Sequence, residues 1–215
     1  MVVGVIIYII YIIDMKTLNN YIKDTYMTEG LFKNIGAEVT VNTRDELSKL
    51  IEKTMKEKGP NCDLNFIDVS KITDMSDLFA KSDFNGDISR WDVSNVTNMH
   101  RMFAYSKFNG DISGWNVSNV TDMSCMFYSS QFNGDISDWD VSNVNNMAWM
   151  FDHSQFNGDI SDWDVSNVNN MAWMFAYSKF NGDISKWDVS NVNNMGWMFN
   201  GSKLKKSHKL PKWYK

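Results

Sequence analysis

The stretch FNGDISRWDVSNVTNMHRMFAYSK, residues 84–107, decides how this chain folds, because it is repeated five times with few changes. A new copy begins every 24 residues, and the same glycine and tryptophan recur inside each copy. The repeated tryptophans are Trp91, Trp115, Trp139, Trp163 and Trp187. A fixed period of roughly 20 to 50 residues is typical of solenoids. Most of the chain therefore encodes one structural turn, and function is expected in the positions that vary and in the flanks.

The spacing of apolar residues changes within one repeat. Trp91 and Val93 alternate with polar residues, which predicts a very short strand with its apolar side inward. Val96, Met99 and Phe103 follow at helical spacing, which predicts a short helix. The segment NGD at residues 85–87 predicts a turn whose glycine takes a positive φ. The expected fold class is α/β: a right-handed, leucine-rich-repeat-like solenoid of 24-residue turns, each a short parallel strand plus a short helix.

We expect four parts along the chain. They are an apolar segment at residues 1–14, an α/β cap at 15–63, the repeat solenoid at 64–203 and a basic tail at 204–215. A cap is expected because the end of a solenoid otherwise exposes a sheet edge and apolar core. The lysine-rich tail is interpreted as a solvated chain end, and contact with an anionic molecule is the alternative.

The expected cap has its own local signals. Apolar residues recur at helical spacing over residues 16–28, and residues 37–41 are typical of a strand. The segment TRDE at residues 43–46 is a capping box, in which the threonine hydroxyl accepts from the glutamate amide and the glutamate carboxylate reaches back to the threonine amide. The helix that follows ends before Gly59, and a strand starts at residues 64–67. The predicted order is β-α-β.

The charge distribution argues against a nucleic-acid partner. The net charge is −5, but the last 13 residues hold six lysines and no acid, which leaves 15 basic and 26 acidic residues in residues 1–202. Nucleic-acid binding depends on neutralising phosphates with basic side chains. Cys62 and Cys125 show no disulfide-framework spacing, so no disulfide is expected between them.

Residues 2–13 are twelve apolar residues without a charge. This is shorter than the about 20 residues of a membrane-spanning helix, and it lacks the basic start and small-residue cleavage site of a signal peptide. Three interpretations remain open: translation that begins at Met15, an atypical signal or membrane-associated anchor, and a buried strand. Membrane association is expected only through residues 2–13. We expect a surface or secreted protein, or a cytoplasmic or virion-associated one if translation begins at Met15.

The motif W-D-V-S-N-V-x-N-M-x-x-M-F, preceded by F-N-G-D-I-S, resembles the BspA-like leucine-rich repeats, also described as DUF285 or Mycoplasma lipoprotein-type surface repeats. The resemblance covers roughly residues 64–203 and recurs in five copies. It implies a solenoid with a non-enzymatic role in adhesion and protein binding at bacterial surfaces, with a protein or glycan as the partner. This chain departs from typical surface members in being short and in showing no clear lipobox or wall-sorting signal. A looser resemblance to phage-encoded proteins implies the alternative, a virion or intracellular structural protein.

Two sets of variable positions are candidate binding surfaces. Trp149, Trp173 and Trp197 share one column off the apolar stripe, and the neighbouring column holds Tyr105, His153 and Tyr177. Exposed aromatic patches mark interaction sites, although packing of these tryptophans against neighbouring turns is the alternative. The second set precedes each core tryptophan, on what is expected to be a flat sheet face: Arg90, Asp138, Asp162 and Lys186.

Other polar columns are interpreted as structural. The repeated acids at the Asp87 and Asp92 positions are expected to bond in turns, with a polar ligand face or a calcium ladder as alternatives. The three histidines lack metal-ligand spacing, and no nucleophile–base pair or phosphate-binding loop is present in the sequence. We therefore expect no cofactor, no metal and no enzymatic activity.

Overall fold

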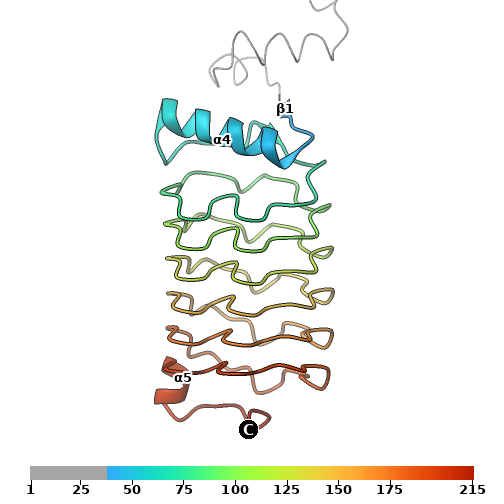
Figure 1. The fold of residues 1–215 in the computed structure, drawn as a ribbon, viewed down its shortest axis with the longest axis vertical. Coiled ribbons are helices and arrows are strands. Elements are labelled where there is room, and N and C mark those ends of the chain that lie inside the picture. Colours follow the sequence, from blue (N-terminus) through green and yellow to red (C-terminus); the bar gives the residue numbers. More distant parts are fainter. Residues whose placement is uncertain (1–37) are drawn as a thin grey trace, which may run out of the picture.

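The computed structural model describes residues 38–215, which wind into a column of stacked turns (Figure 1). The expected helix at residues 16–28 and the apolar segment at 2–13 lie outside the described residues. The regular elements are β1 (Val39–Thr40), α4 (Arg44–Lys58), β2 (Ile67–Asp68) and α5 (Lys203–Lys206). No helix in the described part is long and apolar enough to span a bilayer.

The cap confirms the predicted β-α-β order. β1 pairs in parallel with β2, and α4 lies between them in the sequence. The Thr43 hydroxyl accepts from the Glu46 amide at 3.2 Å, as expected of a capping box. The Glu46 carboxylate accepts from the amide of Asn42 at 2.9 Å, one residue before the amide expected of a capping box. The helix ends at Gly59, whose φ of 85° only glycine adopts readily.

The hydrogen bonds between consecutive turns lie on a different segment from the one predicted. The expected strand at Trp91–Val93 is absent because its backbone groups close tight turns. The Trp91 amide donates to the Ile88 carbonyl at 3.2 Å, and the Val93 carbonyl accepts from the Val96 amide at 2.9 Å. The parallel pairing instead follows the Met-x-x-Met-Phe motif, where Met99 donates to the carbonyl of Asp122 at 2.9 Å. We call this part of each turn the ladder segment.

The helix expected over Val96–Phe103 is also wrong. The segment is a series of turns in which amides bond to carbonyls three residues earlier, such as Met102 to Met99 at 3.2 Å. Arg101 and Tyr105 take φ values of 55° and 59°, which a right-handed helix excludes. The apolar spacing that suggested a helix also fits this series of turns, so each turn of the solenoid contains no helix.

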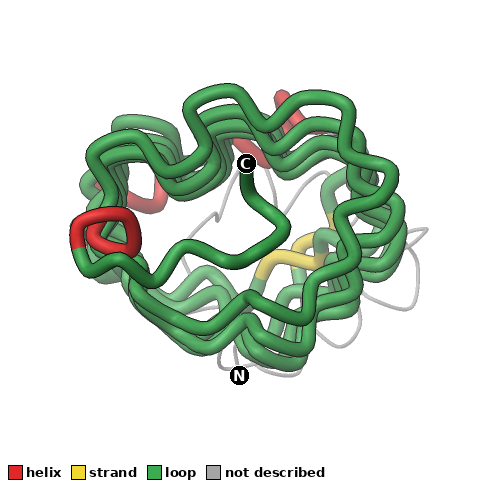
Figure 2. Tube along the Cα trace, turned by 90° about the horizontal axis from the view of Figure 1, so that it is seen from below, coloured by secondary structure: helices red, strands yellow, loops and turns green. Residues whose placement is uncertain are grey.

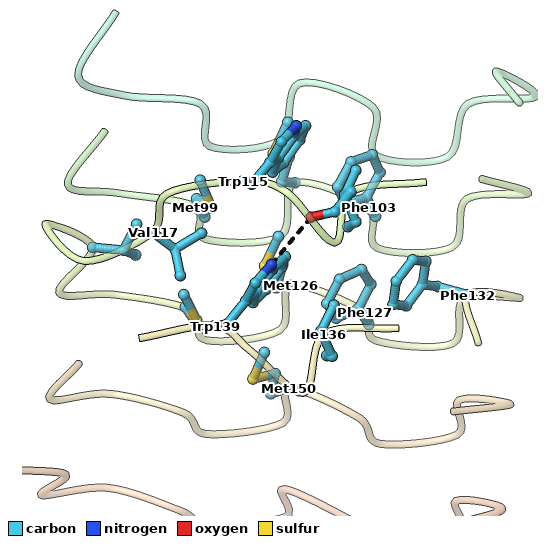
Figure 3. Close-up of a cluster of buried hydrophobic side chains, with 14 of the residues drawn as sticks. Met99, Phe103, Trp115, Val117, Met126, Phe127, Phe132, Ile136, Trp139 and Met150 are labelled. Carbon is cyan, nitrogen blue, oxygen red and sulfur yellow. Dashed lines mark hydrogen bonds between the residues drawn. The ribbon is translucent and has the colours of Figure 1, made fainter. Parts of the chain in front are cut away.

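The core is built from columns of aromatic rings, one from each turn (Figure 3). Phe103 and Phe127 stack with centroids 5.7 Å apart, and Trp115 and Trp91 stack at 6.5 Å. Each core tryptophan also donates its indole N–H to a carbonyl of the preceding turn, as Trp139 does to Ile112 at 3.1 Å. The predicted core columns are therefore confirmed, and each turn depends on its neighbour for both packing and hydrogen bonding.

The repeated glycine has a different role from the one predicted. Gly86 and its counterparts do not take a positive φ. A Cβ on Gly86 would lie 1.9 Å from the Cys62 carbonyl oxygen and 2.8 Å from the Phe84 ring. In the later copies the same phenylalanine ring approaches to 2.8 or 2.9 Å. Glycine is required here by close packing between the chain and its own phenylalanine.

The C-terminal tail is not merely a solvated end. Leu204, in α5, is 1% exposed and continues the core phenylalanine column. Trp213 donates its indole N–H to the Ile184 carbonyl at 3.1 Å, and Tyr214 packs edge-on against Phe199 at 4.9 Å. The tail thus crosses the middle of the end of the solenoid (Figure 2) and covers part of it.

Candidate functional site

Three tryptophans form a continuous stack on the outside of the ladder segment. Trp149 and Trp173 lie 4.7 Å apart with their planes 7° from parallel, and Trp173 and Trp197 lie 5.6 Å apart. Trp149 and Trp173 are half-buried, whereas Trp197 is 61% exposed. Trp149 and Trp173 therefore pack against neighbouring turns, which was the alternative expectation, whereas Trp197 presents its ring to solvent.

The second predicted column lies beside the first. His153 stacks on Tyr177 at 4.6 Å. Tyr128 meets Trp149 and His153 edge-on, each at 6.2 Å, and also meets Tyr105 at 5.0 Å. The sequence analysis did not include Tyr128 among the candidate residues. Its column holds alanine at 104 and 176, so a tyrosine at 128 stood out as a variable aromatic position. We call the joined set the aromatic surface: Tyr105, Tyr128, Trp149, His153, Trp173, Tyr177 and Trp197.

The backbone holds most of these rings in an unusual conformation. Trp149, Trp173 and Trp197 have φ values of 63°, 59° and 59°, a region that bulky residues rarely adopt. Each is the third residue of a tight turn, such as the one closed by Met150 and Met147 at 3.2 Å. The amide of Trp149 also donates to the next turn at 2.9 Å. Hydrogen bonds from two directions therefore fix the backbone beneath Trp149 and Trp173.

The aromatic surface offers hydrogen-bond donors as well as apolar area. Every core tryptophan donates its indole N–H to a carbonyl, but those of Trp149, Trp173 and Trp197 have no acceptor within residues 38–215. A hydrogen bond with the Tyr105 hydroxyl, together with burial, raises the pKa of Tyr128 to about 12. At neutral pH Tyr128 is therefore an uncharged phenol.

A buried acid lies directly beneath the aromatic surface. Asp152 is 1% exposed, and its Oδ1 lies 2.6 Å from Nδ1 of His153. Its Oδ2 has no hydrogen-bond partner. Burial raises the pKa of Asp152, and the neighbouring His153 partly opposes this.

The second predicted set lies at a corner of each turn, not on a flat sheet face. Arg90, Asp138, Asp162 and Lys186 are all exposed. Lys186 occupies the third position of a tight turn closed by Trp187 and Ile184 at 3.3 Å, so the predicted sheet face is wrong. Lys186 also lines a shallow cavity of about 350 Å³ with Asn157, Gly158, Asp159, Ser161, Gly182 and Asp183. In the described part, no ring contact or hydrogen bond joins this set to the aromatic surface.

The acidic columns bond within turns, as predicted. Asp92 accepts from the Ser94 amide at 3.0 Å, and Asp135 from the Ser137 amide at 3.0 Å. This amide bond is the main reason that the pKa of Asp135 lies below its ordinary value. Within residues 38–215, no group of three or more metal-binding side chains is placed to hold an ion.

Comparison with known proteins places the chain in a family. The family described as Mycoplasma protein of unknown function, DUF285, matches the chain twice, over residues 46–154 and 105–213. No curated protein and no solved structure gives a significant match. The two matches overlap and together take in most of α4, all five repeats and most of the tail. The chain therefore belongs to the DUF285 family.

Proposed function

We propose that this protein is non-enzymatic and that its aromatic surface binds a partner protein, as an adhesion module at a bacterial surface. One observation carries the proposal: seven ring side chains from five consecutive turns join into a single partly exposed surface. Tyrosine and tryptophan are enriched among residues that dominate binding energy at protein interfaces. The proposal of a surface location rests on the resemblance of the repeats to bacterial surface proteins.

The rigidity of the surface favours binding. Its backbone is held by hydrogen bonds within and between turns, and its rings pack against one another. Little conformational freedom is then lost when a partner binds, and such preorganisation increases affinity.

The arrangement of the indoles favours a protein over a glycan. Trp149, Trp173 and Trp197 stack face to face, so each ring covers much of its neighbour's face. Sugars commonly pack on open ring faces, and a stack of three indoles leaves only its two end faces, one on Trp149 and one on Trp197, without a further indole. The ring edges and indole N–H groups suit an apolar protein surface with carbonyl acceptors.

The test is binding of the purified protein to an array of extracellular proteins and glycans. Changing Trp149, Trp173 and Trp197 together to asparagine removes the rings, while asparagine tolerates a positive φ. We expect this variant to lose binding to its protein targets. Changing Arg90, Asp138, Asp162 and Lys186 to serine is the matched control and should leave binding intact.

The outcomes separate the candidate surfaces. Unchanged binding by a folded triple-asparagine variant would contradict the aromatic surface as the binding site. Loss of binding in the serine variant alone would transfer the role to the turn corners. Circular dichroism melting of each variant establishes that it is folded.

The proposed location has its own test. Mass spectrometry of the N-terminal peptide, in separated membrane, secreted and cytosolic fractions, identifies where the protein resides. A chain in the membrane fraction or medium supports surface adhesion. A chain confined to cytosol or virions and beginning at Met15 would favour the alternative, an intracellular or virion structural protein.

A further inference from the structure

Each turn of the solenoid directs the same backbone groups toward the turn that follows it, among them one carbonyl and two amides at the start of the ladder segment. In the turn before the last, the carbonyl of Asn169 and the amides of Met171 and Trp173 make hydrogen bonds of 2.8 to 2.9 Å with the last turn. In the last turn the equivalent groups are the Asn193 carbonyl and the amides of Met195 and Trp197. Within residues 38–215 these three groups have no hydrogen-bond partner. We call them the open edge.

The side chains around the open edge are also less covered than their counterparts. Val168 and Met171 are fully buried, whereas Val192 and Met195, one turn later, are half-buried. The tail does not replace a further turn here. It crosses the middle of the end of the solenoid and packs on Phe199 (Figure 2). Backbone groups and apolar side chains are thus left uncovered on the same stretch of chain.

The cap covers part of the other end of the solenoid. The carbonyl of Ser76 accepts hydrogen bonds from the Arg44 guanidinium, one of them at 2.7 Å from Nε, and Arg44 begins α4. Arg44 thus occupies the acceptor that the Trp197 amide of another copy would need if copies stacked head to tail, as Trp173 uses the Gly196 carbonyl within the chain. A contact between two C-terminal ends is favoured instead.

The open edge is self-complementary. The Asn193 carbonyl and the Met195 amide flank Asn194, and both are directed away from the solenoid. When two antiparallel strands place two residues directly opposite each other without a hydrogen bond between them, the residues on either side make the bonds. The carbonyl before one of the opposed residues then accepts from the amide after the other. A two-fold axis through Asn194 therefore directs each Met195 amide at the partner's Asn193 carbonyl.

We propose that two copies of this chain dimerise through their open edges, with the two Asn194 residues opposite each other. The dimer forms two symmetric hydrogen bonds and covers Val192 and Met195 of both copies. Unpaired edges with apolar neighbours are the common route to strand pairing between chains, and a two-fold interface uses the same patch twice. The interface continues the turn-on-turn packing found throughout the solenoid. The interface leaves out Trp149 and Trp173, which lie on earlier turns, whereas Trp197 belongs to both the aromatic surface and the open edge.

A symmetric disulfide tests the register of the pairing. Opposed residues of an antiparallel pair that share no hydrogen bond have Cα atoms about 4.5 Å apart. A disulfide can span this distance. Oxidation of the full chain carrying Asn194→Cys should give a dimer whose peptides are joined through position 194. Asn170→Cys occupies the same column inside the solenoid and should form no dimer joined through position 170 under the same conditions.

A charge substitution tests the interface without cross-linking. Aspartate already occupies this column at Asp122, where it bonds to the Ser124 amide at 2.7 Å, so Asn194→Asp is compatible with the fold. Two carboxylates opposite each other should weaken the dimer about fivefold or more in sedimentation equilibrium. Asn170→Asp is the matched control, and its dimer should be as stable as that of the unmodified chain.

The results divide clearly. A dimer joined at position 194 and weakened by Asn194→Asp alone supports the proposal. A chain that stays monomeric at high micromolar concentration would overturn it, as would a dimer that is indifferent to Asn194→Asp and forms no disulfide at 194. Far-ultraviolet circular dichroism of each variant confirms folding.

Discussion

At the scale of single residues, the burial of Asp152 is a defect that the neighbouring turns lack. Alanine occupies the same column at 104 and 176, and both alanines are fully buried. Burial raises the folded-state pKa of Asp152, so its charge disfavours folding at pH values above that pKa, and the penalty disappears as the pH falls. Asp152→Ala should therefore stabilise the protein at pH 7 by roughly 1 kcal/mol or more.

Chemical denaturation at two pH values measures this effect. The stabilisation should shrink when the pH is lowered through the folded-state pKa of Asp152. The exposed Asp159, whose pKa is lowered by its bond with Ser161, is the control, and Asp159→Ala should not stabilise. A variant at position 152 that is less stable than the unmodified chain at pH 7 would show that the bond with His153 outweighs the cost of burial.

Cys125 gives a second residue-scale prediction. Burial raises the pKa of its thiol from 9.0 to about 11. Because only the thiolate reacts, alkylation at pH 8 should be about 100-fold slower than for an unperturbed thiol, one factor of ten for each pKa unit. Peptide mapping by mass spectrometry after timed treatment with iodoacetamide measures the rate. Equal rates in folded and guanidinium-unfolded protein would contradict the assigned burial.

At the scale of elements, the core tryptophans join consecutive turns. Trp139→Phe removes the bond to the Ile112 carbonyl and leaves that acceptor buried, in addition to losing ring volume. We expect a loss of roughly 1–3 kcal/mol for the unsatisfied carbonyl alone. Trp197→Phe, at an exposed position, should change stability by about 0.5 kcal/mol or less. Denaturant midpoints of the two variants make the comparison, and equal values would refute this role for the indole N–H.

The same elements show what the sequence could predict. The period identified the core columns, and the TRDE box with Gly59 bounded α4 closely, because both signals are local and repeated. The short helix was predicted wrongly at Val96–Phe103, since a series of tight turns buries apolar residues at nearly the same spacing. Arg101, Cys125 and Trp149 carry no signal of a positive φ in their residue types, and each takes it as the third residue of a tight turn. Tyr128 joined the candidate site only once the turns were stacked.

At the scale of the whole molecule, the solenoid is a sum of nearly equivalent layers. Residues 131–151 and 155–175 are identical, so deleting residues 155–178 removes one full 24-residue turn and joins segments that still match. Repeat proteins gain stability from each unit and from each interface between units. The shortened chain should fold, with a circular dichroism spectrum of the same shape and a lower free energy of unfolding. That free energy should also fall less steeply with denaturant concentration, because unfolding exposes less surface.

A deletion of 23 residues tests whether the chain tolerates shortening only when the 24-residue register is kept. Removing residues 155–177 retains one residue more, yet it displaces every column by one position from there onward. Trp187 would then lie one position out of line with Trp139, so its indole N–H would miss the Ile136 carbonyl, which Trp163 uses in the unmodified chain. The paired carbonyls and amides of the ladder segment would no longer meet either. We expect this variant to lose its cooperative transition, while the 24-residue deletion keeps one. Similar unfolding curves for the two deletions would mean that register between turns is not what stabilises the solenoid.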